Sequence, residues 1–519
     1  MANSSKPSFN SQPTQQEVQQ LIGLLNSNQL LQAENVAKNL ISKHANVFIL
    51  HHILSLALDG QQKFTESVTS YKNALKLQPN TPDLLFNLGI ALTHTQQLDE
   101  AIATYKKAIQ IKPDFFEAYG NLGTVYQAQG QLIAAIDSYQ KGLRINPQDA
   151  RGYFNLGTAL RDNGALTEAV SSYQKAISLF PNYTDAHNNL GETLRDLGDM
   201  DAAVNSYQAA LSLNPQHAQA NYNMAEFCYL AKRYLDAIPY FEESQLDDWQ
   251  ERRLYCLYKA EKFDAFKHER DALIAINKHT SPFLATLSTH HSINFKENDP
   301  YNFCKKGLDF VYQRSIPELV NTDLLQALLN DIDNADISER KQGRLTNGQQ
   351  SAGNLFKRKE ASFQTLAGLI KKEFLAYKNQ FSEADCELIQ SFPDELEFTS
   401  SWYVKMQQGG HLSAHIHEIG WISGAVYLAM PNTSGLENEL EGAFEYGTHG
   451  DDYPMMNDAK DIVFPTAHIM PKVGDIVLFP SSLFHRTIPF NSLDKRICIA
   501  FDLKPKAQNN TGVNAKNSY

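Results

Sequence analysis

The chain has 519 residues, enough for roughly two to four domains, and its 42% hydrophobic and 20% charged residues exclude a wholly disordered or collagen-like protein. Its formal net charge of -12 argues against a nucleic-acid-binding protein, which would need a basic face.

No segment has the character of a membrane span or a secretion signal. The longest nearly apolar stretch, residues 421–431, is far shorter than the roughly 20 residues that cross a bilayer, and the N-terminus lacks an apolar signal core. We therefore expect a cytoplasmic protein with no membrane partner. The five cysteines form no Cys-x-x-Cys pair, which indicates buried free thiols rather than disulfides or a thiolate zinc site.

A 34-residue period runs through the first half of the sequence. The repeating columns are prolines (Pro79, Pro113, Pro147, Pro181, Pro215), tyrosines (Tyr71, Tyr105, Tyr139, Tyr173, Tyr207) and glycines (Gly89, Gly123, Gly157, Gly191). Each unit predicts two amphipathic helices that end at the proline, because proline cannot donate a hydrogen bond within a helix. One unit cannot bury its apolar face alone, so the units must stack into a superhelix with a concave surface.

This pattern resembles the tetratricopeptide repeat (TPR), which has Leu-Gly in its first helix, a small residue and an aromatic in its second, and a closing proline. The resemblance implies an α-solenoid that binds a partner, but many different partners are bound by such arrays. We expect a disordered segment over residues 1–14, the array over 15–245, and a helical cap and linker over 246–299.

An asparagine column precedes the Leu-Gly position of the repeats: Asn87, Asn121, Asn155, Asn189 and Asn223. Asparagine is a mediocre helix former, so helix propensity does not explain its recurrence. Its amide can donate and accept hydrogen bonds, which suits the backbone of an extended peptide. The column is similar to the asparagine ladder in the groove of the O-GlcNAc transferase repeats, which binds polypeptide. The alternative is a structural hydrogen bond between helices that is copied with each repeat.

The second half belongs to another structural class. Helical patterns at residues 320–333 and 360–380 precede short β-type segments at 398–406, 423–430, 442–447, 475–480 and 496–503. Several short strands separated by turns predict a jelly-roll β domain with flanking helices, over residues 300–506. The fold class is thus an N-terminal TPR α-solenoid followed by a double-stranded β-helix, and residues 507–519 are expected to be a disordered tail.

Histidines with the spacing of metal ligands lie in this second domain. His415 and His417 are two residues apart, so on a strand both would project from one face. A loop holding His485 follows the segment at 475–480, and Arg496 begins the last strand. Three histidines leave open positions on a metal, and arginine supplies a fork that matches a carboxylate. Exposed strand histidines and an edge-strand arginine would give the same spacing.

The segments 415–428, 478–490 and 495–503 resemble the Fe(II)/2-oxoglutarate dioxygenases, and more closely a bacterial and phage branch related to prolyl hydroxylases. The resemblance implies that His415 and His485 ligate Fe(II) and that Arg496 binds 2-oxoglutarate. His417 stands where the superfamily usually has Asp or Glu, and we rank it above the adjacent Glu418 as the third ligand. Lys495 is a rival to Arg496.

Two further side chains are weaker candidates. Tyr403 is a candidate for a hydrogen bond to the cosubstrate, and Trp421 for a contact with the substrate, although aromatics at strand spacing more often form the core.

The resemblance implies an oxygenase that uses Fe(II), 2-oxoglutarate and dioxygen to hydroxylate a C–H bond. Because repeat arrays accompany such domains in relatives that act on polypeptides, we expect a protein or peptide substrate held by the array. Two alternatives remain open at this point. Three histidines and a water also describe a catalytic zinc hydrolase, and the array could be a non-catalytic adaptor with a degenerate jelly-roll domain.

Overall fold

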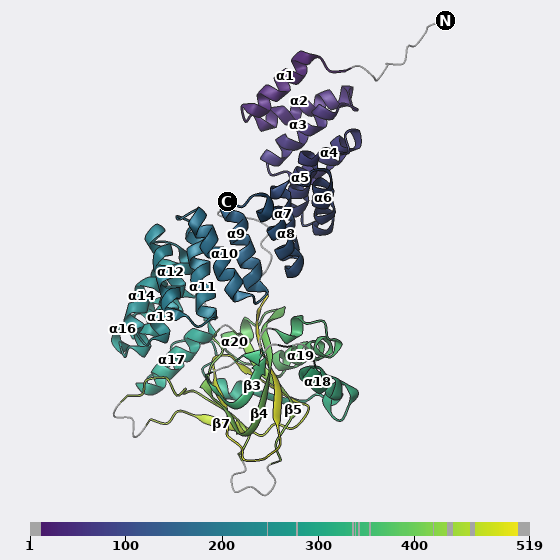
Figure 1. Ribbon diagram of the computed structural model, residues 1–519. Coiled ribbons are helices and arrows are strands. Elements are labelled where there is room, and N and C mark those ends of the chain that lie inside the picture. The colour runs from purple at the N-terminus through teal and green to yellow at the C-terminus, as the bar shows by residue number, and fades with distance from the viewer. Residues whose placement is uncertain are drawn as a thin grey trace. The chain divides into compact units, whose positions relative to one another are not determined.

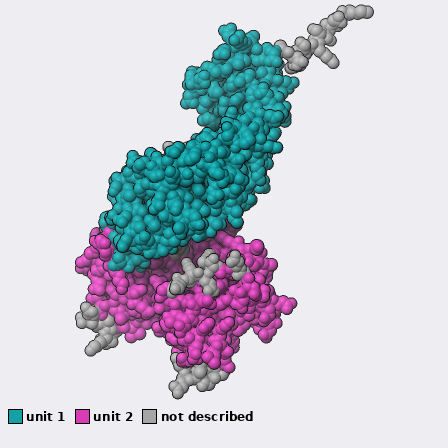
Figure 2. Space-filling model, in the orientation of Figure 1, with its two compact units in different colours: residues 1–231, 239–246 teal, residues 232–238, 247–519 magenta. Residues whose placement is uncertain are grey.

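The computed structural model describes residues 12–246, 248–276, 279–334, 337, 339–340, 343–351, 354–418, 420–432, 440–456 and 462–506. Of the segments expected to be disordered, residues 1–14 and 507–519, only residues 12–14 are described, and Thr14 caps the first helix. The chain divides into two compact units, one of residues 1–231 and 239–246 and the other of residues 232–238 and 247–519 (Figure 2). None of the helices in the described ranges is long and apolar enough to cross a membrane.

The first unit is an array of helices of similar length (Figure 1). They are α1 (Gln15–Asn26), α2 (Leu30–Lys43), α3 (Phe48–Gly60), α4 (Phe64–Leu77), α5 (Pro82–His94), α6 (Leu98–Ile111), α7 (Phe116–Ala128), α8 (Leu132–Ile145), α9 (Ala150–Asp162), α10 (Leu166–Leu179), α11 (Thr184–Asp196), α12 (Met200–Leu213) and α13 (Ala218–Leu230). The boundary between the units falls within α14 (Tyr234–Ser244). The predicted α-solenoid is confirmed.

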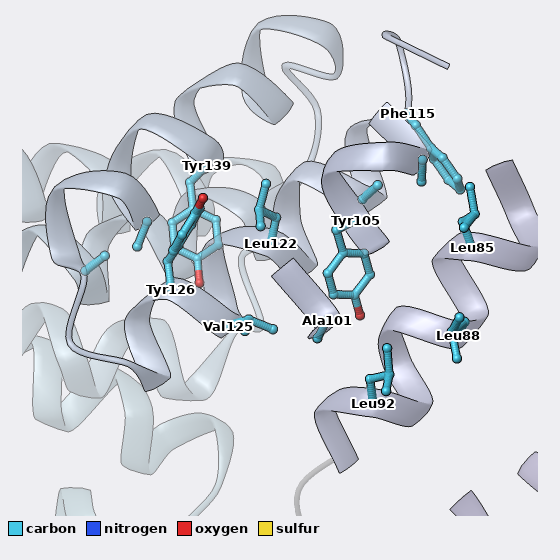
Figure 3. Packing of buried hydrophobic residues seen from close by; sticks show 14 of the residues in the cluster. Leu85, Leu88, Leu92, Ala101, Tyr105, Phe115, Leu122, Val125, Tyr126 and Tyr139 are labelled. Atoms are coloured by element: carbon cyan, nitrogen blue, oxygen red, sulfur yellow. The ribbon is translucent and has the colours of Figure 1, made fainter. Parts of the chain in front are cut away.

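The tyrosine and glycine columns form one repeated contact. The Tyr105 ring of α6 packs on Gly89 of α5, where an added Cβ would lie only 2.5 Å from a ring carbon. Tyr139 of α8 packs in the same way on Gly123 of α7, and it lies near Leu122 and Val125 in the continuous core of the array (Figure 3). The glycine therefore lets two helices of one repeat approach closely around a buried aromatic ring.

The second unit combines helices with a curled antiparallel sheet. Its helices are α15 (Trp249–Lys259), α16 (Phe263–Ile276), α17 (Pro282–Asn294), α18 (Asp323–Asn334), α19 (Ala361–Gln380) and α20 (Glu387–Gln390), with the short 3₁₀ helices η1 (Gly307–Phe310), η2 (Pro317–Leu319) and η3 (Leu355–Lys357). Its strands are β1 (Tyr312–Ser315), β2 (Glu339–Arg340), β3 (Leu345–Ser351), β4 (Leu396–His415), β5 (Ile422–Ala429), β6 (Phe444–Gly447), β7 (Thr466–Ile469), β8 (Asp475–Pro480), β9 (Phe484–Thr487) and β10 (Arg496–Pro505).

Strand β4 joins the two parts of the sheet. The sheet order is β1-β8-β5-β10-β4-β9-β6-β7, with β3 paired to β4 and β2 to β3. The first part of β4 pairs with β10 up to Met406, and its last residues pair with β9. Between these parts Gly409 has a φ of 74°, which few residues other than glycine adopt. The result is the predicted jelly-roll architecture, a sheet curled into a half-barrel (Figure 1).

Helices α15, α16 and α17 bury polar side chains among aromatic rings. His291 of α17 is 1% exposed, stacks on Phe295 and accepts a hydrogen bond from Arg270 at 3.3 Å. Burial, and secondarily the Arg270 guanidinium, lower the pKa of His291 to about 4. A proton on this ring would be both desolvated and next to a cation.

The glycines of α7 provide a matched test of the close approach. A Cβ at Gly123 would lie 2.7 Å from a carbon of the Tyr139 ring, whereas a Cβ at Gly120 would have nothing within 4 Å. Gly123→Ala should lower the free energy of unfolding by about 1–3 kcal/mol through overpacking. Gly120→Ala should raise it by about 0.5–1 kcal/mol, because alanine is the better helix former. Denaturant unfolding followed by circular dichroism measures both, and effects of the same sign would contradict the packing argument.

His291 should make the second unit sensitive to acid. Its pKa is near 6.5 in an unfolded chain and about 4 when folded, so between these values the unfolded state binds the extra proton. Stability is therefore lost as the pH falls from 6.5 toward 4. His291→Phe, which keeps the ring packing, should make the unfolding temperature depend less steeply on pH in this window. Equal slopes for the variant and the wild type would show that this ring does not titrate as described.

Candidate metal centre and its surroundings

The β4–β9 register brings two of the predicted histidines together. His415 is the last residue of β4 and is the cross-strand partner of His485 in β9. Their ring centroids are 4.3 Å apart. His417 lies two residues beyond the end of β4, with its ring centroid 4.8 Å from that of His485 and 5.2 Å from that of His415. One nitrogen from each ring lies within 4.8 Å of the others, which suits three ligands of one metal ion.

Hydrogen bonds donated by Nδ1–H orient all three rings. The Nδ1 atoms of His415 and His485 face the carbonyls of Ser413 and Leu483, at 2.9 and 3.3 Å. The Nδ1 atom of His417 faces the carboxylate of Asp502. Since these oxygens only accept, Nδ1 is the donating nitrogen of each ring, which leaves Nε2 as the atom that can bind a metal. The Nε2 atoms of His415 and His417 are 3.3 Å apart, so these two atoms converge.

Burial keeps the His415 and His485 rings neutral. Burial, and then the neighbouring His417 ring, lower the pKa of His415 to about 3. Burial and the rings of His415 and His417 lower the pKa of His485 well below its usual value. Neutral imidazole is the form that binds a metal, so these rings are available as ligands at neutral pH.

Asp502 is a site residue that the sequence analysis missed. Besides the His417 ring, its carboxylate accepts hydrogen bonds from Ser423 Oγ at 2.7 Å and Ser400 Oγ at 2.8 Å. Burial raises the pKa of this carboxyl, yet His417 and the two hydroxyls hold it below its ordinary value. The alternation of residues along a strand could have indicated it, because Asp502 follows Arg496, Cys498 and Ala500 at every second position of β10 and is therefore expected on the same face.

Arg496 lines the same narrow cavity as the three histidines. The lining comprises Trp402, Val404, Met406, Leu412, His415, His417, Gly424, Ala425, Tyr427, Phe444, Phe479, His485, Arg486, Thr487, Arg496, Cys498 and Ala500. Arg496 is 2% exposed. In the described part of the chain its guanidinium contacts the Gly442 carbonyl at 3.3 Å, Cys498 Sγ at 3.8 Å and the Tyr427 ring at 5.0 Å. None of these groups is a carboxylate.

Three other predicted or considered residues lie away from this cavity. Tyr403 is buried between two cavity-lining residues of β4 and is absent from the lining, with the Lys405 ammonium over its ring at 5.0 Å. Trp421 donates from Nε1 to the Leu388 carbonyl at 3.2 Å and packs edge to face on Phe303. Glu418 forms an ion pair with Arg252 at 2.6 Å. The structure therefore does not bring them to the histidine cluster.

The asparagine column has mixed surroundings. The side chains of Asn87, Asn121, Asn155 and Asn189 are half-buried. Burial raises the pKa of Tyr105 to about 12, and hydrogen bonds from Thr93 and Asn121 oppose that rise. Asn223 is buried and donates to Asn188 Oδ1 at 3.0 Å and Glu192 Oε1 at 3.1 Å. Asn189 also has intramolecular partners, because its Oδ1 accepts from Asn188 at 3.3 Å and its side chain hydrogen-bonds to Tyr173. Asn121, Asn189 and Asn223 thus bond within the array, although the first four members of the column are half-buried rather than buried.

Family models match both parts of the chain. Residues 400–502 match the family described as "Putative 2OG-Fe(II) oxygenase". TPR models match residues 60–95, 91–130, 116–149, 138–171, 157–194 and 188–250. The chain therefore joins TPR repeats to a domain of this 2OG-Fe(II) oxygenase family. The resemblance found in the sequence is confirmed at the level of both families.

Several solved structures are similar to about a third of this chain. They include MamA, with 27% identity, 32% of this chain and 97% of MamA covered, and a TM-score of 0.31. MamA from Desulfovibrio magneticus RS-1 has 24% identity, with 32% and 95% covered and a TM-score of 0.32. YrrB, described as a TPR protein with an unusual peptide-binding site, has 22% identity, with 36% and 95% covered and a TM-score of 0.32. No curated protein matches the chain.

Proposed function

We propose that the chain is an Fe(II)- and 2-oxoglutarate-dependent oxygenase that hydroxylates a protein or peptide recruited by its TPR array. One observation carries the proposal: three inward-facing histidine nitrogens share a cavity with a buried arginine whose described contacts include no carboxylate. The match of residues 400–502 to the oxygenase family supports the same chemistry.

The donor set fits Fe(II). Imidazole nitrogen is a common ligand of iron, and three ligands from His415, His417 and His485 leave positions open for a cosubstrate and dioxygen. The Nδ1–H groups are already held by Ser413, Leu483 and Asp502, so the ligand rings need little reorganisation on binding.

Arg496 fits the distal carboxylate of 2-oxoglutarate. A guanidinium taken out of water at 2% exposure is costly unless an anion compensates it. The contacts described for Arg496 are all with neutral groups: the Gly442 carbonyl, the Cys498 thiol, and the ring and hydroxyl of Tyr427. Burial raises the pKa of the Cys498 thiol, which therefore remains neutral beside the guanidinium. A carboxylate bound to the guanidinium by two hydrogen bonds would balance its charge and accept from its N–H groups.

The residues of the chain would divide the work in the following way. Iron with 2-oxoglutarate and dioxygen supplies the oxidising chemistry when bound. The histidines hold the metal, Arg496 orients the cosubstrate, and the apolar walls from Val404, Phe444 and Phe479 exclude water from the cavity. In this scheme the chain contributes geometry and charge, and the bound group supplies the reaction chemistry.

The array is the part of the chain suited to hold a polypeptide. Stacked TPR helices present a concave surface. Half-buried asparagines recur once per repeat at Asn87, Asn121, Asn155 and Asn189, and the proposal is that their amides face this surface. An amide can donate to a peptide carbonyl and accept from a peptide N–H. Recognition of the backbone would select extended segments with little preference for side chains.

Succinate formation tests the oxygenase. Supplied with Fe(II), 2-oxoglutarate and ascorbate, the full chain should release succinate, and His485→Ala should abolish the release because one metal ligand is lost. Arg496→Met should weaken 2-oxoglutarate binding by about 30-fold or more, the cost of leaving a carboxylate unpaired. Lys495→Met is the matched control, since this neighbouring residue is exposed. Full activity of His485→Ala, or no succinate from the iron-loaded wild type, would contradict the oxygenase and favour an adaptor.

The asparagine column can be tested with a randomised peptide library. Peptides that gain one oxygen are detected by mass spectrometry after incubation with the iron-loaded chain. Asn87→Ala, Asn121→Ala and Asn155→Ala combined should lower the yield about tenfold or more, at about 1 kcal/mol for each lost hydrogen bond. Lys107→Ala with Lys175→Ala, both exposed on second helices, is the control. An unchanged yield in the asparagine variant would assign the column to helix packing.

A further inference from the structure

We infer that Asp502 is a positioning residue which, through His417, gives the three-histidine centre the negative charge that a carboxylate ligand provides in a two-histidine, one-carboxylate site. The inference rests on the proposed function, because it concerns the same metal centre. His417 occupies the position at which the resemblance leads one to expect an acidic ligand. A carboxylate is present in the structure, but it belongs to Asp502, which lies behind His417 and is hydrogen-bonded to it.

The three rings differ in what accepts their Nδ1–H. His415 and His485 donate to backbone carbonyls, which are neutral acceptors. His417 alone donates to a carboxylate. A carboxylate behind an imidazole makes the opposite nitrogen a stronger electron donor and fixes the ring orientation. The negative charge of Asp502 therefore acts on only one of the three histidines. That histidine is His417, which stands where the family usually has an acidic ligand.

Hydrogen bonds and strand pairing hold the Asp502 carboxylate in this position. It lies on β10, where its neighbours pair with both β4 and β5, and its pairing partners include Ser400 and Ser423. The hydroxyls of both serines donate to it, and the Ser423 hydroxyl is itself bonded to Ser481 at 2.7 Å. A carboxylate with three donors from three separate segments has little freedom to turn away.

The charge balance gives the reason for the arrangement. A divalent ion with three neutral imidazoles keeps a local charge of about +2, whereas a two-histidine, one-carboxylate site reduces it to about +1. Adding Asp502 to the three-histidine site restores about +1. Three histidines alone would hold Fe(II) more weakly, and the carboxylate compensates without using a coordination position.

The test measures binding of Co(II) alone to the full chain by calorimetry and by its visible absorption. Asp502→Asn keeps an oxygen that accepts from His417 and removes the charge, while the new amide NH2 can donate to the Ser400 hydroxyl. This variant should weaken Co(II) binding by about 10- to 100-fold. Asp475→Asn is the matched control. Asp475 is also a buried carboxylate of the sheet, but it accepts from Gln313 and the Lys472 amide, away from the histidines. Its variant should bind Co(II) like the wild type.

A second background separates charge supply from mere support of the fold. In His417→Asp the metal has a carboxylate ligand of its own, and Asp502 becomes a second negative charge beside it. Adding Asp502→Asn there should leave Co(II) affinity unchanged or raise it, the opposite sign to its effect in the wild type. An equal loss in both backgrounds would mean that Asp502 only supports the structure, and would overturn the inference.

The outcomes also distinguish the inference from the function on which it rests. If His485→Ala binds Co(II) as tightly as the wild type, the metal centre itself is refuted. If His485→Ala loses binding while Asp502→Asn keeps the wild-type affinity and absorption, the centre stands and only the role of Asp502 is refuted.

Discussion

The register of β4 against β9 is the constraint on which the candidate site depends. It pairs His415 directly with His485, and a slip of one residue would turn one of these rings to the opposite face of the sheet. The irregularity between Leu412 and His415 sets this register after the long first half of β4 has paired with β10. One strand thus places two histidines and, through β10, the arginine and the aspartate.

Much of the architecture was predictable because it follows from periodicity. The 34-residue columns predicted the array, and the glycine and tyrosine columns have a common explanation in one ring-on-backbone contact. The runs that became β4, β5, β6, β8 and β10 were also visible as alternating or buried segments. Short strands with polar composition could not be recognised in the sequence. Strand β9, which carries His485, was expected to be a loop because its four residues are too few to show a pattern.

The sequence indicated which residues meet at the candidate site, but not which residues support them. Spacing and residue type indicated His415, His417, His485 and Arg496, but the orientation of a neighbour depends on a register that one sequence does not reveal. Tyr403 illustrates this limit, since it alternates with Trp402 and Val404, and those two residues line the cavity while Tyr403 does not. Asp502 illustrates the converse, since its importance arises from three contacts across the sheet.

Strand β10 carries a positive and a negative side chain on the face that it turns toward the candidate site. Arg496 and Asp502 belong to the same alternating set of β10, and six residues of extended chain separate them by about 20 Å, too far for an ion pair between them. Arg496 is buried and the Asp502 side chain is only 13% exposed, so each needs a counter-charge from elsewhere. Asp502 meets the His417 ring, whereas Arg496 meets only neutral groups among the described residues. The cavity is therefore polarised along β10, with the anion behind the three histidines and the cation at Arg496, which is the arrangement that the proposed metal and diacid cosubstrate would require. A zinc hydrolase would need the histidines alone, and the buried guanidinium is the feature that favours an oxygenase over that alternative.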